Sequence, residues 1–114
     1  MRDTNQWMSE LLAPLDVPMC EAPMPRDCPG AYCVWQRQKE RIVYASGKPF
    51  LRHIVLRVTL LLIPSEDAEA ATRRLLQLLD ARPDSHAVFE KTEYLPELSR
   101  RAVAVRCTLM EESP

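Results

Sequence analysis

Four cysteines are the residues in this chain best suited to bind a metal. Cys20, Cys28, Cys33 and Cys107 could offer four thiolates to a zinc ion. Structural zinc sites normally take their ligands in pairs about two to four residues apart. The first three cysteines here are separated by eight and five positions, so the spacing disfavours zinc. A cysteine inside a strand is more often a small buried hydrophobe, and we therefore expect no metal.

Catalytic groups are equally sparse. His53 and His86 are the only histidines, and no local signature pairs either with a nucleophilic cysteine. Glu90 and Glu93 are three positions apart, an odd step along a strand, so we expect them on opposite faces rather than as a carboxylate pair. We predict that the protein is not an enzyme and uses no cofactor. Cysteine–histidine chemistry stays as a minor alternative.

Phosphate and base recognition are also weakly indicated. The segment Ser46-Gly47-Lys48 looks superficially like a phosphate-binding loop, but a predicted strand follows it instead of a helix. Trp35 and Tyr44 lie near basic residues and could stack on bases. Aromatic side chains in strands more often serve a core or an interface, so we expect no sequence-specific nucleic acid partner.

Charge is distributed unevenly along the chain. The net charge of −1 gives no overall field that would draw the protein to nucleic acid or to an anionic membrane. Residues 37–57, however, contain six basic residues and one acidic residue, whereas residues 58–114 contain seven basic and ten acidic residues. The simplest interpretation is a set of solvated faces. The alternative is a charged surface that meets an oppositely charged neighbour.

Residues 1–30 are expected to hold a helix and a connector. Apolar residues recur at helical steps in residues 1–16, where Thr4 could cap a short helix and Pro14 limits it. Residues 17–30 are rich in proline and predict an extended connector, with a possible short strand near residues 17–20.

A hairpin and a long strand follow. Residues 31–36 alternate as a strand, residues 37–40 form a charged turn, and residues 41–45 return. A loop over 46–49 then leads into a strand over 50–63, whose even positions are apolar from Ile54 onward.

The C-terminal half predicts a helix and a second hairpin. Ser65 is expected to cap the helix, Pro83 to end it, and strands are expected over 86–95 and 100–110.

These elements define one α+β domain over residues 1–114. The expected order is α-β-β-β-α-β-β, with a mostly antiparallel sheet, both helices packed on one face, and residues 31–112 as the sheet–helix–sheet core. The first twenty residues lack the apolar run that a secretory signal would need. The apolar run 58–63 is too short to span a bilayer. We therefore expect no membrane partner and free thiols in a reducing cytosol.

With its elements placed, the chain resembles small phage proteins of the tail terminator or tail completion (head–tail joining) group over roughly residues 29–112. The resemblance is architectural. The stretches that carry it are PGAYCVWQ, ERIVYASGKPF, HIVLRVTLLLI, PSEDAEAATRRLLQLL and VFEKTEYLPELSRRAVAVRCTL.

The resemblance implies a structural role in virion assembly. Such proteins form a ring, usually a hexamer, that caps the tail tube protein and joins it to the head–tail connector protein in the tail or neck of the virion, after assembly in the host cytoplasm. DNA passes through the lumen without sequence-specific contacts. The basic 37–57 segment and the acidic C-terminal half could form two complementary sides of a head-to-tail contact.

We predict the subunit contacts in the first hairpin and the loop after it. The alternative function is a small protein-binding adaptor or regulatory module that uses the same hairpin. The predicted contact residues are Arg37, Lys39 and Arg41 at the hairpin tip, and Ser46, Gly47, Lys48 and Pro49 in the loop.

Overall fold

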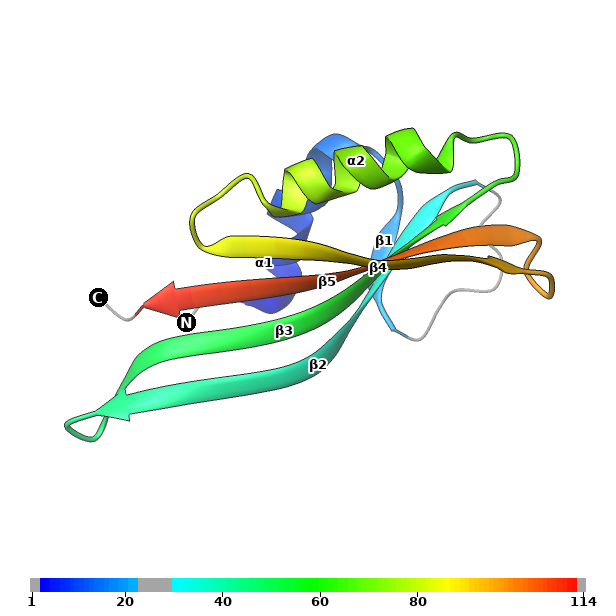
Figure 1. Ribbon diagram of the computed structural model, residues 1–114. Coiled ribbons are helices and arrows are strands. Elements are labelled where there is room, and N and C mark those ends of the chain that lie inside the picture. Colours follow the sequence, from blue (N-terminus) through cyan, green and yellow to red (C-terminus); the bar gives the residue numbers. More distant parts are fainter. Residues whose placement is uncertain (1–2, 23–29, 113–114) are drawn as a thin grey trace.

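The computed structural model describes residues 3–22 and 30–112, so residues 23–29 of the predicted connector, including Cys28, lie outside the described residues. Figure 1 shows the chain as a twisted sheet with helices on one side and a projecting hairpin. The elements are α1 (Thr4–Leu12), a 3-10 turn η1 (Ala13–Leu15), β1 (Met19–Glu21), β2 (Tyr32–Ala45), β3 (Lys48–Leu62), α2 (Ala68–Leu79), β4 (Ser85–Leu95) and β5 (Arg100–Glu112).

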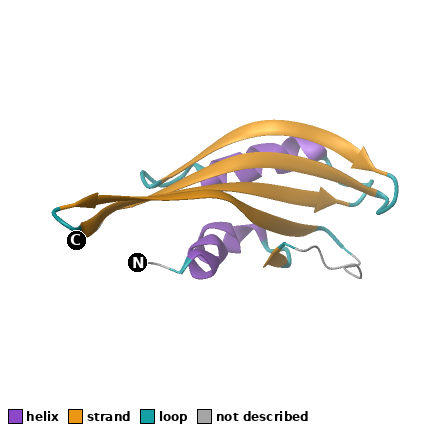
Figure 2. Cartoon of the chain, turned by 90° about the horizontal axis from the view of Figure 1, so that it is seen from below, coloured by secondary structure: helices purple, strands orange, loops and turns teal. Residues whose placement is uncertain are grey.

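The five strands form one sheet in the order β1-β2-β3-β5-β4. Only β1 and β2 run parallel, and the other three strand pairs are antiparallel. This confirms the predicted α+β class and the order α-β-β-β-α-β-β, but the three strands before α2 are β1, β2 and β3 instead of a two-stranded hairpin and a long strand. β1 corresponds to the short strand considered near residues 17–20. The molecule is elongated, with extents of 53 × 25 × 22 Å, because β2 and β3 run well past the body (Figure 2).

Each helix begins at an aspartate that caps its free backbone N–H groups. Asp3 accepts a hydrogen bond from the backbone nitrogen of Asn5 at 3.0 Å, so the predicted cap Thr4 is instead the first helical residue. Asp67 accepts hydrogen bonds from the second and third residues of α2, at 3.0 and 3.3 Å. The predicted cap Ser65 therefore lies before the helix.

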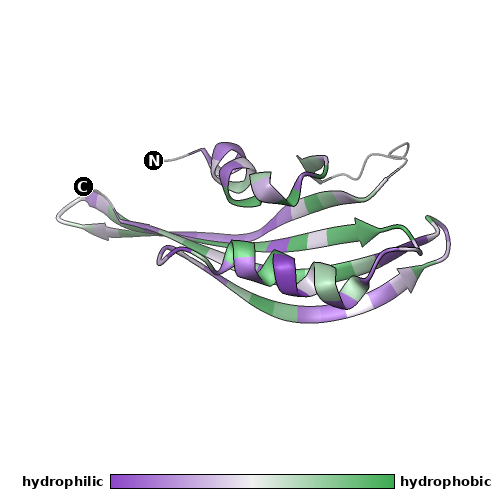
Figure 3. Ribbon diagram, turned by 90° about the horizontal axis from the view of Figure 1, so that it is seen from above, coloured by the Kyte–Doolittle hydropathy of each residue, from purple (hydrophilic) through white to green (hydrophobic). Residues whose placement is uncertain are grey.

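The main core lies between the two helices and one face of the sheet, which we call the helix face. Trp7, Leu11 and Leu12 of α1 and Leu75 and Leu79 of α2 are buried against it. Figure 3 shows apolar residues along the strands that these helices cover. The sheet contributes Cys33, Trp35, Ile54, Leu56, Val58, Leu60, Leu62, Val103, Val105, Cys107 and Leu109 to this core.

The opposite face of the sheet, which we call the far face, has a smaller apolar cluster. Tyr32, Val34, Leu61 and Ala102 are buried there. Tyr32 and Val34 lie on the far face, whereas their neighbours Cys33 and Trp35 lie on the helix face. This confirms the alternation expected of this strand.

The predicted charged turn at residues 37–40 is wrong, because β2 continues through it as one strand to Ala45. The pairing shifts by one residue between Arg37 and Lys39, so Gln38 is the extra residue of a β-bulge. The chain reverses instead at Ser46 and Gly47, whose φ values of 53° and 76° suit a tight two-residue turn between twisted strands. Lys48 and Pro49, predicted to be in a loop, are the first residues of β3.

Candidate interaction surfaces

The described cysteines are placed for packing. Cys33 and Cys107 are fully buried in the main core. Burial, and more weakly the neighbouring Cys20, raises the pKa of Cys33 to about 12. Burial, and more weakly Asp80, raises the pKa of Cys107 to about 12. Both thiols therefore stay protonated at neutral pH, whereas nucleophilic attack and metal binding need a thiolate.

Among the described residues, neither histidine forms a hydrogen bond with a cysteine. The Nδ1 atom of His86 is 2.9 Å from a carboxylate oxygen of Asp80, and both side chains are exposed. His53 sits in the middle of β3, between Arg41 of β2 and Met110 of β5. Within residues 3–22 and 30–112, no three His, Cys, Asp or Glu side chains gather as a metal site would require.

Arg52 anchors the hairpin to the body from a buried position. Its Nε atom is 2.6 Å from the carboxylate of Glu40 on β2, and Nη1 is 3.8 Å from that of Glu111 on β5. Its Nη2 atom donates a hydrogen bond to the Thr4 hydroxyl of α1 at 3.1 Å. One guanidinium therefore joins the first helix to three strands, at the point where the hairpin leaves the core.

Beyond Arg52 the hairpin forms an arm, which we define as residues 42–51. It projects from the body at the end where Figure 1 also places the C-terminus. Strand β5 flanks it only as far as the pair Leu51 and Glu112. Tyr44 and Phe50 near its end are 61% and 53% exposed, so the arm presents two large apolar side chains to solvent.

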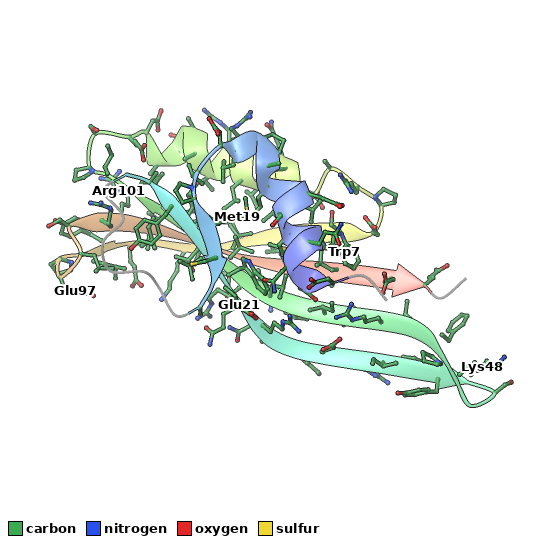
Figure 4. All side chains as sticks on the ribbon, turned by 180° about the vertical axis from the view of Figure 1, so that it is seen from behind. Trp7, Met19, Glu21, Lys48, Glu97 and Arg101 are labelled. Carbon is green, nitrogen blue, oxygen red and sulfur yellow. The ribbon has the colours of Figure 1, made fainter. Side chains whose placement is uncertain are left out.

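The three predicted basic contacts do not form one cluster. Arg37 is on the helix face, where its Nε atom is 3.2 Å from Glu21 and its guanidinium lies over the Trp35 ring, 5.8 Å from the centroid. Lys39 and Arg41 follow the bulge and lie on the far face, opposite Val55 and His53 of β3. The four residues from Ser46 to Pro49 lie together at the end of the arm (Figure 4, where Lys48 is labelled).

A second bulge, at Glu90, corrects the expectation for the two glutamates of β4. The pairing of β4 with β5 shifts between Phe89 and Lys91. Because of the extra residue, Glu90 and Glu93 both lie on the far face, where Glu90 is 3.3 Å from Arg57 and Glu93 is 3.5 Å from Lys91. Each glutamate is paired with a cation.

These ion pairs also change how the charge asymmetry is interpreted. Arg52 and Arg57, from the basic segment, contact Glu111 and Glu90 of the acidic half inside the same chain. The two halves are interleaved on neighbouring strands of one sheet. They therefore do not form two separate charged sides.

The far face is hollowed beside this charged region. A cavity of about 380 Å³ has Val34, Leu61, Ala102 and Ala104 among its lining residues, together with the charged side chains of Arg57, Lys91 and Glu93. Small side chains on β5 leave this space, and the alternation of the sequence gave no sign of it. At the outer edge of the sheet, Val88, Phe89 and Tyr94 of β4 are also exposed.

No protein-family model and no curated protein matches this chain. None of the described helices has the length and apolar character needed to cross a membrane.

Proposed function

We propose that this protein is a structural subunit that assembles with copies of itself into a ring, as in the phage tail terminator and tail completion group that it resembles. The observation that supports this most is the arm. Its exposed Tyr44 and Phe50 lie outside the body that could bury them. Large exposed aromatic side chains on a projecting element are typical of protein contacts, where they supply much of the binding energy.

The arm is suited to a fixed contact rather than a loose one. Arg52 joins its base to α1, β2 and β5 through the contacts described above. A pre-ordered contact element loses less conformational entropy when it binds. If each arm seats on a different surface of the next copy, the contact is head-to-tail and closes into a ring when the rotation permits.

In this proposal the ring acts by its geometry. It docks on the end of the tail tube protein, stops further growth, and offers its other side to the head–tail connector protein, which places the protein in the virion. The turn residues Ser46, Gly47, Lys48 and Pro49 keep the contact role that the sequence predicts, because they form the end of the arm. The three predicted basic contacts are less suited to that role, because Glu21 already pairs with Arg37 and because Lys39 and Arg41 lie on the far face before the arm begins.

The test is the mass of the particle in solution. Mass photometry of the purified chain, alone and with tail tube protein, should detect a closed oligomer of 13.1-kDa subunits. The double variant Tyr44→Ser, Phe50→Ser should reduce the oligomer to monomer while circular dichroism stays unchanged. Tyr94→Ser is the matched control, because Tyr94 is 56% exposed but lies near the other end of the sheet.

Two results would contradict the proposal. One is a chain that stays monomeric both alone and with tube protein, which would favour the adaptor alternative. The other is an arm variant that assembles as well as the wild type, which would mean that the arm is not the subunit contact.

A further inference from the structure

A cluster of basic side chains on the far face of the sheet has no role in the ring proposal. We call it the basic patch, and its members come from four strands. Two cations are on β2, one is on β3, one on β5 and one on β4, and their side chains are all exposed or partly exposed. The basic patch consists of Lys39, Arg41, Arg57, Arg106 and Lys91.

Strand pairing places two of these cations directly opposite each other. Arg57 of β3 pairs with Arg106 of β5, and both side chains line the same hollow together with Gln38, Lys39 and Glu90. Directly opposed side chains in an antiparallel pair have Cβ atoms roughly 4.5–5.5 Å apart, where like charges destabilise the sheet. Glu90, which is 3.3 Å from Arg57, offsets part of that cost, and a further anion bound between the two arginines would offset the rest.

Carboxylates of the chain neutralise only part of the patch. Glu90 lies 3.3 Å from Arg57, and Glu93 lies 3.5 Å from Lys91. Among the described residues, no carboxylate forms an ion pair with Lys39, Arg41 or Arg106. From the Arg41–His53 row to the Glu93–Ala102 row, the far face therefore has five basic and two acidic side chains and a net charge of +3.

We infer that this face binds the phosphate backbone of double-stranded nucleic acid without sequence specificity. The patch crosses four strands, roughly 14 Å at the usual strand spacing, so it is wider than one phosphate. Duplex DNA carries a phosphate about every 3.4 Å of axis on each strand and can meet several of these cations at once. Arginine suits this partner because its planar guanidinium binds phosphate oxygens bidentately.

The composition of the patch favours duplex over the other polyanions. Among the described residues of the far face, His53 is the ring beside these cations, opposite Arg41, and no Phe, Tyr or Trp pairs with any of the five, whereas single-strand binding depends on bases that stack on such rings. An acidic peptide would need apolar anchors for most of its affinity. The hollow that contains Lys39 and Arg106 is otherwise lined by Gln38, Val55, Arg57 and Glu90. Apolar surface adjoins it at Val88, opposite Arg106, and in the cavity that Arg57 and Lys91 also line, so an acidic peptide is the competing partner that the test includes. The inference does not depend on ring formation.

The test measures binding of a fluorescent duplex of about 20 base pairs and mixed sequence to the full chain by anisotropy. Wild-type affinity should fall steeply between about 50 and 200 mM salt as counterions are released. Arg106→Gln should weaken binding roughly five- to tenfold at low salt and lower the salt slope by about 1. The double variant Lys39→Gln, Arg106→Gln should have a still lower affinity for the duplex and a still smaller salt slope.

Arg101→Gln is the matched control. Arg101 is an exposed arginine of the same strand, but it pairs with Leu62 and Tyr94 on the helix face (Figure 4). This variant removes the same charge and should bind duplex as the wild type does. Folding is checked separately, because Arg106→Gln relieves the like-charge pair and should raise the urea midpoint slightly.

Three outcomes would overturn the inference. The first is a wild-type chain that does not bind duplex at about 50 mM salt. The second is a double variant that binds as well as the wild type, or a control that loses as much affinity as Arg106→Gln. The third is a wild type that binds poly-glutamate more tightly than duplex at the same salt, which would assign the patch to an acidic protein partner.

Discussion

Arg52 and Glu40 form the closest ion pair of the hairpin, 2.6 Å apart on neighbouring strands, and the Arg52 side chain is only 8% exposed. The same guanidinium reaches Thr4 and Glu111, so a single buried charge connects the arm with the first helix and the last strand. A buried cation is costly unless carboxylates and hydrogen-bond acceptors surround it. The position of the arm should therefore depend on this cluster.

Replacing Arg52 by alanine should lower the free energy of unfolding by about 3 kcal/mol, because two carboxylates then lose their shared cation. This loss of free energy is at the low end of the range for buried ion pairs, because the Glu40 side chain is 35% exposed. Urea denaturation measures the change. Arg73→Ala is the control, because its partner Glu69 is fully on the surface and should contribute less than about 0.5 kcal/mol. Equal losses in both variants would contradict a special role for Arg52.

Stability should decline in alkaline solution because of the two core thiols. Cys33 and Cys107 have pKa values of about 12 in the folded chain, against an ordinary value of 9.0. Between these two values the unfolded chain loses the protons that the folded chain keeps. The unfolded state is then favoured by up to about 1.4 kcal/mol per thiol and pH unit. Below the ordinary pKa both states are protonated, and this contribution to the pH dependence disappears.

The measurement is the urea midpoint as a function of pH in the wild type and in Cys107→Ala. Other groups titrate in the same range, so the difference between the two chains is what matters. The variant should be less stable at neutral pH because it leaves a cavity, but its stability should fall less steeply above about pH 9. Parallel curves would mean that the thiol of Cys107 titrates normally. Native-state labelling with a thiol reagent at neutral pH should likewise leave Cys33 and Cys107 unmodified.

The two glycines offer a matched pair for testing the turn of the arm. Gly47 has a φ of +76°, and alanine there should cost about 1 kcal/mol because an L side chain disfavours this region. A Cβ at Gly30 would meet no atom within 4 Å, and no positive φ constrains it. Gly30→Ala should therefore be neutral within about 0.5 kcal/mol. Thermal or urea unfolding of both variants checks this, and a neutral Gly47→Ala would argue against the tight turn.

The alternation of the strands and the apolar stripes of the helices follow from the order of the residues alone. Cys33 and Trp35 face the helices while Tyr32 and Val34 face away, and the even positions of β3 from Ile54 to Leu62 are all buried. These patterns are local, because the side-chain period of a strand or a helix depends only on backbone geometry. They were sufficient to predict the α+β class, the order of the elements and the single layer of helices.

The positions of the two bulges and the pairing of the charged side chains depend on how distant segments pack together. The charged segment 37–40 is predicted as a turn, but in the structure it pairs with β3, a strand of fifteen residues. Gln38 is the extra residue, and a β-bulge accommodates it. That bulge moves Lys39 and Arg41 to the far face, and the bulge at Glu90 brings that residue to Arg57. The opposition of Arg57 and Arg106 likewise depends on register. Register is set by pairing between distant segments, so no local pattern could have predicted it.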